Sequence, residues 1–331
     1  MANSVFLLFC GVGTFIIGLK LLSGGIGDLM TDKLDKLFKN PKCGKFGCLT
    51  IGTAAAAICQ SSGAVTAISV CLVDSGILSL VQSGAIVMGA NVGTTVTAQI
   101  IALSTLTSGG INFEIVFGSI SLIGAGVTVC AKKDKSKKIG FLTAGFGLIF
   151  IGLFLISDAM GSFSQNEKIV GFLSSLTNDY LLIAVGAALT AVMQSSSGLT
   201  GIIIAALPMG ILNLNQAIML TFGSNIGSSS VALIAGAGTS ENAKVSSRFN
   251  LIFNLIGVII FMIASNVLNI FGLSYASLLN QVFVAPQIAL SMMHLIFNLI
   301  SVIILYPFTN SLIAISKFPK IKGAKRLKEQ R

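Results

Sequence analysis

Residues 60–97 read QSSGAVTAISVCLVDSGILSLVQSGAIVMGANVGTTVT, and residues 194–231 read QSSSGLTGIIIAALPMGILNLNQAIMLTFGSNIGSSSV. The two stretches align without a gap at an offset of 134 residues, and 13 of the 38 aligned positions are identical. Six of the identical pairs are polar: Gln60/Gln194, Ser61/Ser195, Ser62/Ser196, Thr66/Thr200, Gln82/Gln216 and Asn91/Asn225. Chance similarity between apolar segments would not retain such residues, so the chain contains an internal duplication.

The composition is that of a membrane protein. Hydrophobic residues make up 54% of the 331 residues, charged residues only 10%, and the mean hydropathy is +0.93. Charged residues are about a quarter of an ordinary soluble domain, so a soluble fold is excluded. The net charge of +10 comes from Lys and Arg in short loops and in the tail. This placement indicates orientation in a membrane, and we expect no nucleic-acid binding because no basic face alternates with stacking aromatic residues.

Enzyme chemistry is not expected from this chain. The carboxylates are few, and the sequence has no HExxH, no nucleotide-binding glycine loop and no C-x-x-C pair. These are the motifs that would signal hydrolysis, nucleotide use or redox chemistry. We therefore expect neither a catalytic residue nor a cofactor.

Several apolar tracts are long enough to span a bilayer. They lie near residues 5–24, 78–104, 112–131, 139–161, 214–238, 249–272 and 287–316. The tracts 48–73 and 181–208 differ, because Gln-Ser-Ser interrupts each at its middle. Each half has about 12 residues, or roughly 18 Å of helix, which is too short for a hydrocarbon core of about 30 Å. We interpret both tracts as re-entrant helical hairpins with Gln-Ser-Ser at the tip, the alternative being continuous helices with packed polar residues.

The predicted fold is an all-α polytopic membrane protein with two inverted repeats. Each repeat has a span, a re-entrant hairpin, a broken span and one further span, hence three crossings. An odd number of crossings requires the second repeat to lie upside down in the membrane. In that arrangement 20 of the 21 Lys and Arg residues fall on one side, with Lys168 the exception, as the positive-inside rule demands.

The expected domain boundaries follow from these tracts. They are repeat 1 at 1–131, a basic cytoplasmic linker at 132–138, inverted repeat 2 at 139–272, an extra span at 286–316 and a basic cytoplasmic tail at 317–331. We expect a multi-pass protein of the cell (inner) membrane with the N-terminus outside and the C-terminus in the cytoplasm.

The repeated elements offer hydroxyls, amides and helix ends at mid-membrane. The second half-helix of each hairpin begins at the tip, where its free N–H groups and positive dipole end suit an anion. The segments GANVGTT (89–95) and GSNIGSS (223–229) add oxygen ligands, and glycines on each side of Asn are expected to let the helix unwind. Carbonyl, amide and hydroxyl oxygens suit Na⁺. The residues alone therefore predict a secondary transporter that couples an anion or polar solute to Na⁺.

These motifs resemble the type II sodium/phosphate cotransporter family. The resemblance rests on the doubled Gln-Ser-Ser element, each followed by G-x-N-[IV]-G-[TS]-[TS], and on H-L-x-F-N at 294–298. It implies sodium-coupled symport of inorganic phosphate by alternating access, with both hairpins forming the site. One departure is Gly63, which replaces the third serine of the first motif and removes a hydroxyl. The second tip, which keeps this serine, is the better candidate.

The resemblance carries over to named residues. Phosphate is expected at Gln60, Ser61, Ser62, Gln194, Ser195, Ser196 and Ser197. Sodium is expected at Thr66, Thr200, Asn91, Thr94, Thr95, Asn225, Ser228 and Ser229. The expected partners are inorganic phosphate, Na⁺ and the lipid bilayer, and a homodimer stays open.

Five further polar residues stand out in or beside the apolar tracts. Asn254, Asn298 and the single histidine, His294, are candidates for function, the alternative being hydrogen bonding between spans. Asp74 is expected in a loop at the inner surface, and Asp158 as either a cation-sensitive group or a helix-end residue. Functional alternatives on the same fold are transport of another anion, export of phosphate, a channel or a scaffold.

Overall fold

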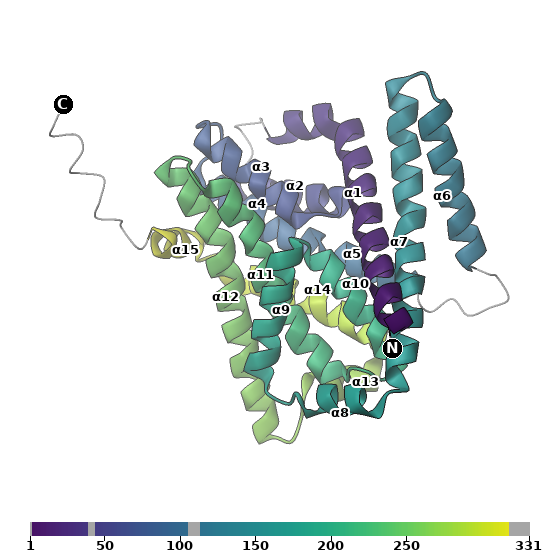
Figure 1. The fold of residues 1–331 in the computed structure, drawn as a ribbon. Helices are drawn as coiled ribbons and strands as arrows, with labels where there is room; N and C mark the ends of the chain where they lie inside the picture. Colours follow the sequence, from purple (N-terminus) through teal and green to yellow (C-terminus); the bar gives the residue numbers. More distant parts are fainter. Residues whose placement is uncertain (1, 39–43, 105–112, 318–331) are drawn as a thin grey trace, which may run out of the picture.

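The computed structural model describes residues 2–38, 44–104 and 113–317, and every regular element in these ranges is a helix (Figure 1). The elements are α1 (Ala2–Phe38), α2 (Lys45–Cys59), α3 (Ser62–Asp74), α4 (Leu80–Gly93), α5 (Thr95–Ser104), α6 (Phe113–Cys130), α7 (Asp134–Ser164), α8 (Glu167–Ser175), α9 (Asp179–Met193), α10 (Ser196–Ala206), the 3₁₀ turn η1 (Leu207–Met209), α11 (Leu214–Gly236), α12 (Glu241–Ile270), α13 (Tyr275–Val282), α14 (Pro286–Leu305) and α15 (Thr309–Ser316). Within these ranges, six segments are long and apolar enough to cross a membrane. They lie in α1, α4 with α5, α7, α11, α12 and α14. The predicted all-α polytopic class is confirmed.

Some expected boundaries are wrong. The tract 287–316 is two helices, because α14 ends at Leu305 and α15 begins at Thr309. Pro307 lies in the turn between them, and proline cannot donate the backbone hydrogen bond that would continue the helix. Helix α1 runs beyond residue 24 to Phe38, and the short helices α8 and α13 occupy connections for which no helix was expected. The basic tail beyond Lys317 lies outside the described residues, as do Lys39 and Lys42.

Identical residues of the two repeats start two matched helices. Ser79 precedes α4, and its side chain accepts the backbone N–H of Gln82, whose side chain accepts the N–H of Ser79 in return. Asn213 and Gln216 form the same reciprocal pair before α11. This capping box satisfies N–H groups that a helix start leaves unpaired. The identity Gln82/Gln216 is therefore explained by helix initiation.

Glycines bring each of these helices into backbone contact with the first half of its hairpin. A Cβ added to Gly89 on α4 would lie 2.0 Å from the carbonyl oxygen of Leu49 on α2. A Cβ on Gly223 in α11 would lie 2.0 Å from the carbonyl oxygen of Ile183 on α9. The two contacts are equivalent at the 134-residue offset, so both repeats use the same helix packing.

These glycines do not unwind the second helix as expected. Helix α11 is continuous through residues 223–229, and Gly223 and Gly227 serve its close contact with α9. Its polar side chains are bonded within the helix. The Asn225 Nδ2 donates to the Thr221 carbonyl oxygen at 2.9 Å, and the Ser228 Oγ donates to the Asn225 carbonyl oxygen at 2.7 Å. In the first repeat the interruption is only Thr94, between α4 and α5. The prediction of a broken helix is wrong for the second repeat.

The first helices of the two repeats, α1 and α7, contact each other through equivalent residues. A Cβ on Gly18 in α1 would lie 2.6 Å from the backbone nitrogen of Ile149 in α7, and one on Gly152 would lie 2.5 Å from that of Phe15. At the 134-residue offset, Phe15 is equivalent to Ile149 and Gly18 to Gly152. Since residue 15 meets 152 and residue 18 meets 149, α1 and α7 run antiparallel.

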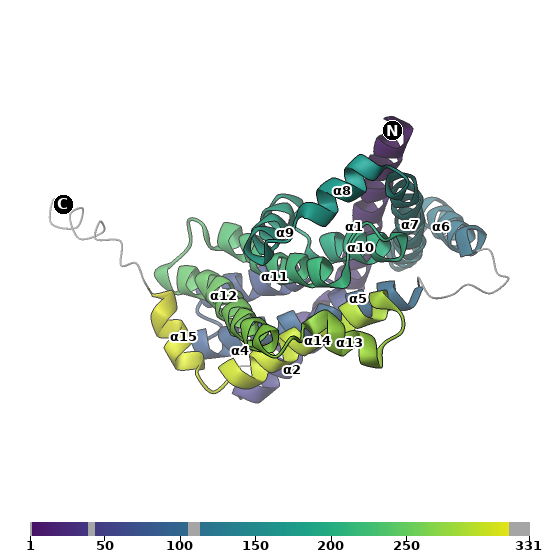
Figure 2. The ribbon, with the colours of Figure 1, turned by 90° about the horizontal axis from the view of Figure 1, so that it is seen from below.

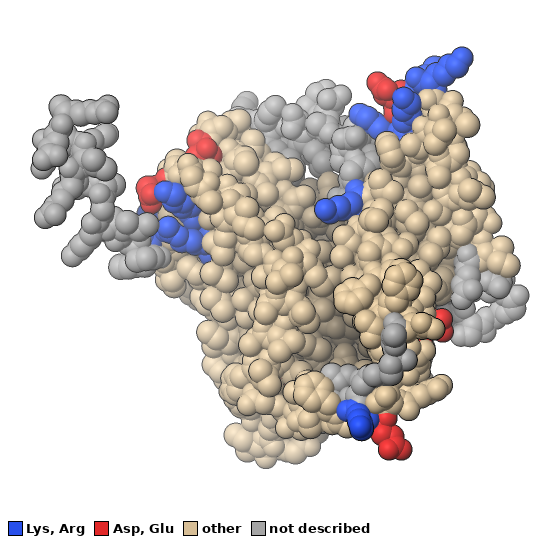
Figure 3. Space-filling view, in the orientation of Figure 1, with Lys and Arg blue, Asp and Glu red and all other residues tan. Residues whose placement is uncertain are grey.

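Helix α11 lies at the centre of the molecule. It contacts α9 and α10 of its own repeat, α3 of the first repeat, and α12 and α14. Figure 2 shows it between α9 and α12. On the face shown in Figure 3, Lys and Arg lie in the upper half, over the α6–α7 connection, over α1 and near the start of α12, and one further group lies near the lower edge over α8. An almost uncharged belt separates these two regions.

Asp74 links the end of α3 to α12. Its Oδ1 accepts the backbone N–H of Ser240, the N-cap of α12, at 2.8 Å. The Ser240 N–H and hydroxyl hold the pKa of the exposed Asp74 carboxyl below its ordinary value. Asp74 was expected in a loop, but it is the last residue of α3 and its side chain is exposed. This contact ties α3 to α12.

Asp74→Asn is expected to lower the thermal stability slightly at pH 7. A carboxyl whose pKa is lowered by folding stabilises the protein above its unfolded pKa of about 3.9, and this contribution is lost as the pH falls through the lower folded value. The difference in melting temperature between wild type and variant should therefore shrink below about pH 4. Melting curves in detergent between pH 3 and pH 7 measure it, and a constant difference over that range would contradict the assignment.

Candidate functional site

Two glutamines hold the backbone of the matched turns in the left-handed region. Gln60 follows α2 with φ 51°, and Gln194 follows α9 with φ 52°. Within the described residues they are the only non-glycine residues with positive φ. This conformation disfavours residues other than glycine by about 1 kcal/mol or more. Retention of glutamine at both places indicates that its side chain has a role, since such strain concentrates at functional sites.

The serine after each glutamine precedes the next helix and caps its N-terminus. The Ser61 Oγ accepts the backbone N–H of Ala64 at 3.2 Å, and the Ser195 Oγ accepts that of Gly198 at 3.0 Å. Both serines are N-caps with extended backbone, so α3 begins at Ser62 and α10 at Ser196. The N–H groups of the first helical turns have no acceptor within their helices. Figure 1 places α2 and α3 in the upper half of the molecule and α9 and α10 in the lower half.

The two turns meet across one small cavity of about 30 Å³. It is lined by Gln60, Ser61, Ser62, Gly63, Gln194, Ser195, Ser196, Ser197, Ser228 and Val231. All seven residues predicted for phosphate line this cavity, although the two copies of the motif are 134 residues apart in sequence. The cavity is small, and nearly all the residues that line it are polar.

Most residues predicted for sodium do not line the cavity, and only Ser228 does. They are buried on α3, α10, α4, α5 and α11: Thr66, Thr200, Asn91, Thr94, Thr95, Asn225 and Ser229. The Thr66 Oγ1 donates to the Gly63 carbonyl oxygen at 2.9 Å, and the Thr95 Oγ1 donates to that of Val92 at 2.7 Å. The Thr200 Oγ1 is buried and has no partner among the described residues.

The two halves of the cavity wall differ in polarity. A Cβ on Gly63 would lie 3.2 Å from a methyl carbon of Val231 on α11, so an apolar contact stands where the third serine is missing. At the 134-residue offset these positions become Ser197 and Thr97. Thr97 is on α5, which contacts α10, and its buried Oγ1 has no partner among the described residues. Gly63 and Val231 thus stand at the positions equivalent to the polar residues Ser197 and Thr97. The sequence comparison identified this difference only at Gly63.

Two buried amide networks hold the repeated asparagines. The Asn91 Nδ2 donates to the Asn250 Oδ1 on α12 at 3.1 Å. In the second repeat, the Asn225 Oδ1 lies 3.3 Å from the His294 Nε2 and accepts the Asn298 Nδ2 at 3.4 Å, both on α14. His294 and Asn298 thus make the interhelical hydrogen bonds that were the alternative to a functional role, and these contacts do not exclude such a role. Asn250 was not predicted, although it aligns with His294 in the echo between 249–256 and 293–300.

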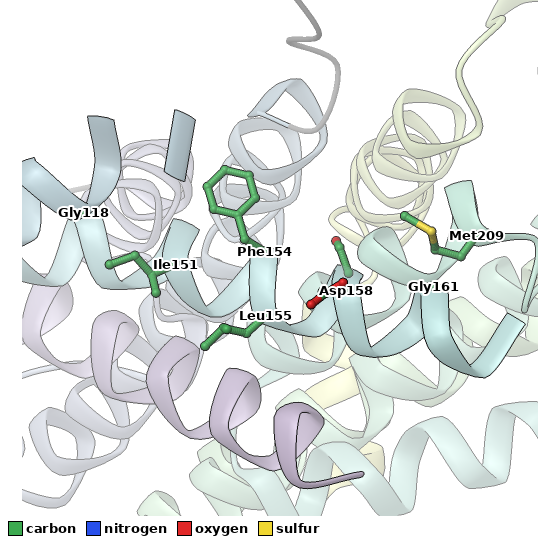
Figure 4. A pocket seen from close by; sticks show the side chains of 8 residues that line it. Gly118, Ile151, Phe154, Leu155, Asp158, Gly161 and Met209 are labelled. Atoms are coloured by element: carbon green, nitrogen blue, oxygen red, sulfur yellow. The ribbon is translucent and has the colours of Figure 1, made fainter. Parts of the chain in front are cut away.

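A larger hollow lies elsewhere, between α6, α7 and η1. It has a volume of about 650 Å³ and is lined by Gly118, Ile151, Phe154, Leu155, Ser157, Asp158, Gly161 and Met209. Figure 4 shows the exposed Asp158 carboxylate at its wall among apolar side chains. The hollow contains none of the polar residues of the repeated stretches 60–97 and 194–231, so we do not regard it as the candidate site.

Comparison with known proteins gives the class first. The sequence model of the Na⁺/Pi-cotransporter family matches the chain twice, over residues 14–158 and 156–294. The matches cover most of the chain, which is thus a multi-pass membrane protein of a phosphate transporter family. It belongs to the Na⁺/Pi-cotransporter family, which confirms the resemblance drawn from the motifs. Each match contains one copy of the repeated stretch.

Relatives include bacterial and mammalian proteins. "Uncharacterized protein YqeW" of Bacillus subtilis is 26% identical over 300 residues, which is 89% of this chain and 92% of YqeW. "Putative inorganic phosphate export protein YjbB" of Escherichia coli is 27% identical over 262 residues, or 78% of this chain and 45% of YjbB. "Sodium-dependent phosphate transport protein 2C" of Rattus norvegicus is 36% identical over 126 residues, or 34% and 20% of the two chains. No solved structure matches the chain.

Proposed function

We propose that the protein is a secondary transporter that moves inorganic phosphate together with Na⁺ by alternating access. The observation that carries this proposal is the meeting of the two Gln-Ser-Ser turns across one cavity. Such a meeting places two helix starts and six side-chain hydroxyls or amides around a single point without any charged side chain. The membership in a phosphate transporter family supports the choice of substrate.

The turns supply donors that an oxyanion requires. The first-turn N–H groups of α3 and α10 and the helix dipoles favour negative charge. The hydroxyls of Ser62, Ser196 and Ser197 can donate to phosphate oxygens, and so can the amide groups of Gln60 and Gln194. The two turns come from opposite repeats and close the cavity between them, so alternating access would require the turns to move relative to each other. Such a movement would open the site toward one side of the membrane at a time.

Sodium would occupy the oxygen-rich region next to the anion. The hydroxyl oxygens of Thr97 on α5 and Thr200 on α10 are buried and unpartnered among the described residues. Ser197, one turn before Thr200 on α10, lines the cavity. A cation here would offset the charge of phosphate, which lowers the penalty of dehydrating either ion in a medium of low dielectric constant. The apolar pair Gly63 and Val231 makes the first turn the weaker candidate for this cation.

The test is the flux of ³²P-phosphate in proteoliposomes. We expect uptake that needs an inward Na⁺ gradient and that arsenate inhibits more strongly than sulfate or carboxylates do, because arsenate shares the geometry and charge of phosphate. Replacing Na⁺ by K⁺ or choline should abolish accumulation. Uptake that is indifferent to Na⁺ would refute the coupling, and transport of sulfate in preference to phosphate would refute the substrate. Currents far above turnover rates would instead favour a channel.

Export of phosphate is the second candidate, and the name of YjbB is the observation that favours it. The same vesicles loaded with ³²P-phosphate measure efflux under an outward Na⁺ gradient. A coupled carrier is expected to run in both directions, so the physiological direction depends on the gradients in the cell. Efflux without any response to Na⁺ would favour an uncoupled exporter.

We also propose that the two repeats lie inverted in the membrane, with hairpins that enter from opposite sides. The antiparallel crossing of α1 and α7 and the gathering of Lys and Arg in the upper half of Figure 3 support this arrangement. In a cysteine-free background, Lys168→Cys on intact cells should react with an impermeant maleimide, whereas Lys135→Cys should react only after permeabilisation. Labelling of both positions in intact cells would contradict the inversion.

A further inference from the structure

The buried asparagines of α12 and α14 donate hydrogen bonds but keep a free oxygen. The Asn254 Nδ2 donates to the Ser229 Oγ at 3.2 Å and to the Asn250 Oδ1 at 3.1 Å. The Asn298 Nδ2 donates to the Asn225 Oδ1 and, at 2.9 Å, to the His294 carbonyl oxygen. Both side chains are fully buried, and neither Oδ1 has a partner among the described residues. Unpaired acceptors in such a place are unfavourable unless something else binds them.

A third unpartnered oxygen lies at the same helix crossing. The Ser301 Oγ is buried and without a partner among the described residues, one turn after Asn298 on α14. It points at the backbone of α12, since a Cβ added to Gly257 would lie 2.9 Å from it. Gly257 is one turn after Asn254. Helix α11 contacts both helices, so it closes a third side of this region.

The three oxygens follow the internal echo of the sequence. Asn254 and Asn298 are equivalent at the 44-residue offset that relates 249–256 to 293–300, and Gly257 and Ser301 are equivalent at the same offset. Glycine on one side leaves room for the serine hydroxyl of the other. Both asparagines thus donate their amide nitrogens to α11 and keep an unpartnered amide oxygen beside the contact of Gly257 with Ser301.

We propose that Asn254 Oδ1, Asn298 Oδ1 and Ser301 Oγ hold a sodium ion between α11, α12 and α14, apart from the cavity between the two turns. All three are neutral oxygens, which suits a monovalent cation, whereas Ca²⁺ sites depend on carboxylates. Neutral oxygens from helices in the protein interior are the ligand type that membrane transporters use for Na⁺. Backbone carbonyls of the crossing helices would have to complete the coordination.

This second site would act on the first through α11. Asn298 bonds the Asn225 side chain, and the Asn225 carbonyl oxygen accepts the Ser228 hydroxyl, whose residue lines the cavity between the turns. A cation that fixes Asn298 thereby fixes the segment of α11 that faces the candidate phosphate site. The inference extends the proposed sodium coupling and rests on it for the identity of the cation.

The test is binding of ²²Na⁺ to the purified full chain in the absence of phosphate. We expect saturable binding in wild type, loss of one component in Asn254→Ala and Asn298→Ala, and an affinity about tenfold lower in Ser301→Ala, since one neutral ligand is removed. Ser265→Ala removes a buried hydroxyl farther along α12 and should bind ²²Na⁺ like wild type. Gln194→Gly, at the other site, should keep the component that Asn254→Ala loses.

The outcomes separate this inference from the proposed function. Unchanged ²²Na⁺ binding in folded Asn254→Ala and Asn298→Ala would overturn the second site, and so would wild type that binds no Na⁺ at all. If the asparagine variants do not fold, unchanged affinity in Ser301→Ala overturns it by itself. Wild type that binds ²²Na⁺ at this site but moves no phosphate would instead refute the transport function alone.

Discussion

Gln194→Gly is expected to weaken sodium-driven phosphate accumulation strongly, through a lower apparent affinity for phosphate, while the protein becomes no less stable. Glycine adopts the left-handed conformation at φ 52° without a steric penalty, so the turn after α9 keeps its geometry. The loss is confined to the amide group that faces the cavity. A hydrogen bond to a charged partner contributes about 1.5–3 kcal/mol, so the apparent affinity for phosphate should fall roughly 10- to 100-fold.

The comparison with Gln194→Ala isolates the side chain from the backbone. Alanine removes the same amide but keeps the strained conformation, so this variant should transport as poorly as the glycine variant and be less stable by about 1 kcal/mol. Ser196→Ala, which removes a hydroxyl from the first turn of α10, should lower affinity by a similar factor. The control is Gln165→Gly at the exposed end of α7. Wild-type kinetics in Gln194→Gly and Ser196→Ala would refute the assignment of the turn.

The candidate site could be predicted because the duplication placed rare polar residues at matched positions. The short lengths of the apolar segments on either side of Gln60 and Gln194 identified the interruptions. The free N–H groups at a helix start identified a possible anion site after each. The structure adds that the two turns face each other across one cavity. This arrangement cannot be inferred from either copy of the motif alone. The structure also adds the conformation of the glutamines, since sequence shows residue type but not backbone angle.

What the sequence could not predict depends on packing between distant segments. Glycines beside Asn225 looked like helix breakers, yet their absent side chains serve the contact of α11 with α9. Propensity is a weak guide here because a buried helix in a membrane keeps its backbone bonds at almost any composition. Val231 and Asn250 likewise could not be predicted as site residues from the sequence, because their contacts with Gly63 and Asn91 depend on how the helices pack.

The packing role of the glycines leads to the second large effect. Gly223→Ala is expected to destabilise the protein severely, because the new methyl group would lie 2.0 Å from the Ile183 carbonyl oxygen and 2.9 Å from the Ala187 backbone nitrogen. Overpacking by one methyl group usually destabilises by about 1–3 kcal/mol. Here the obstacle is backbone on both helices, so no side-chain rotation relieves it and α9 must move away from α11.

Movement of α9 would carry Gln194 with it, so any folded Gly223→Ala protein should also transport phosphate poorly. Gly126→Ala is the matched control, because a Cβ at that exposed position on α6 meets no atom within 4 Å. Alanine is the better helix former by about 1 kcal/mol, so this control should be as stable as wild type or more so. Melting temperature and the yield of monodisperse protein in detergent measure both variants. Equal stability of the two would show that the helices are not in the backbone contact that positions the second turn.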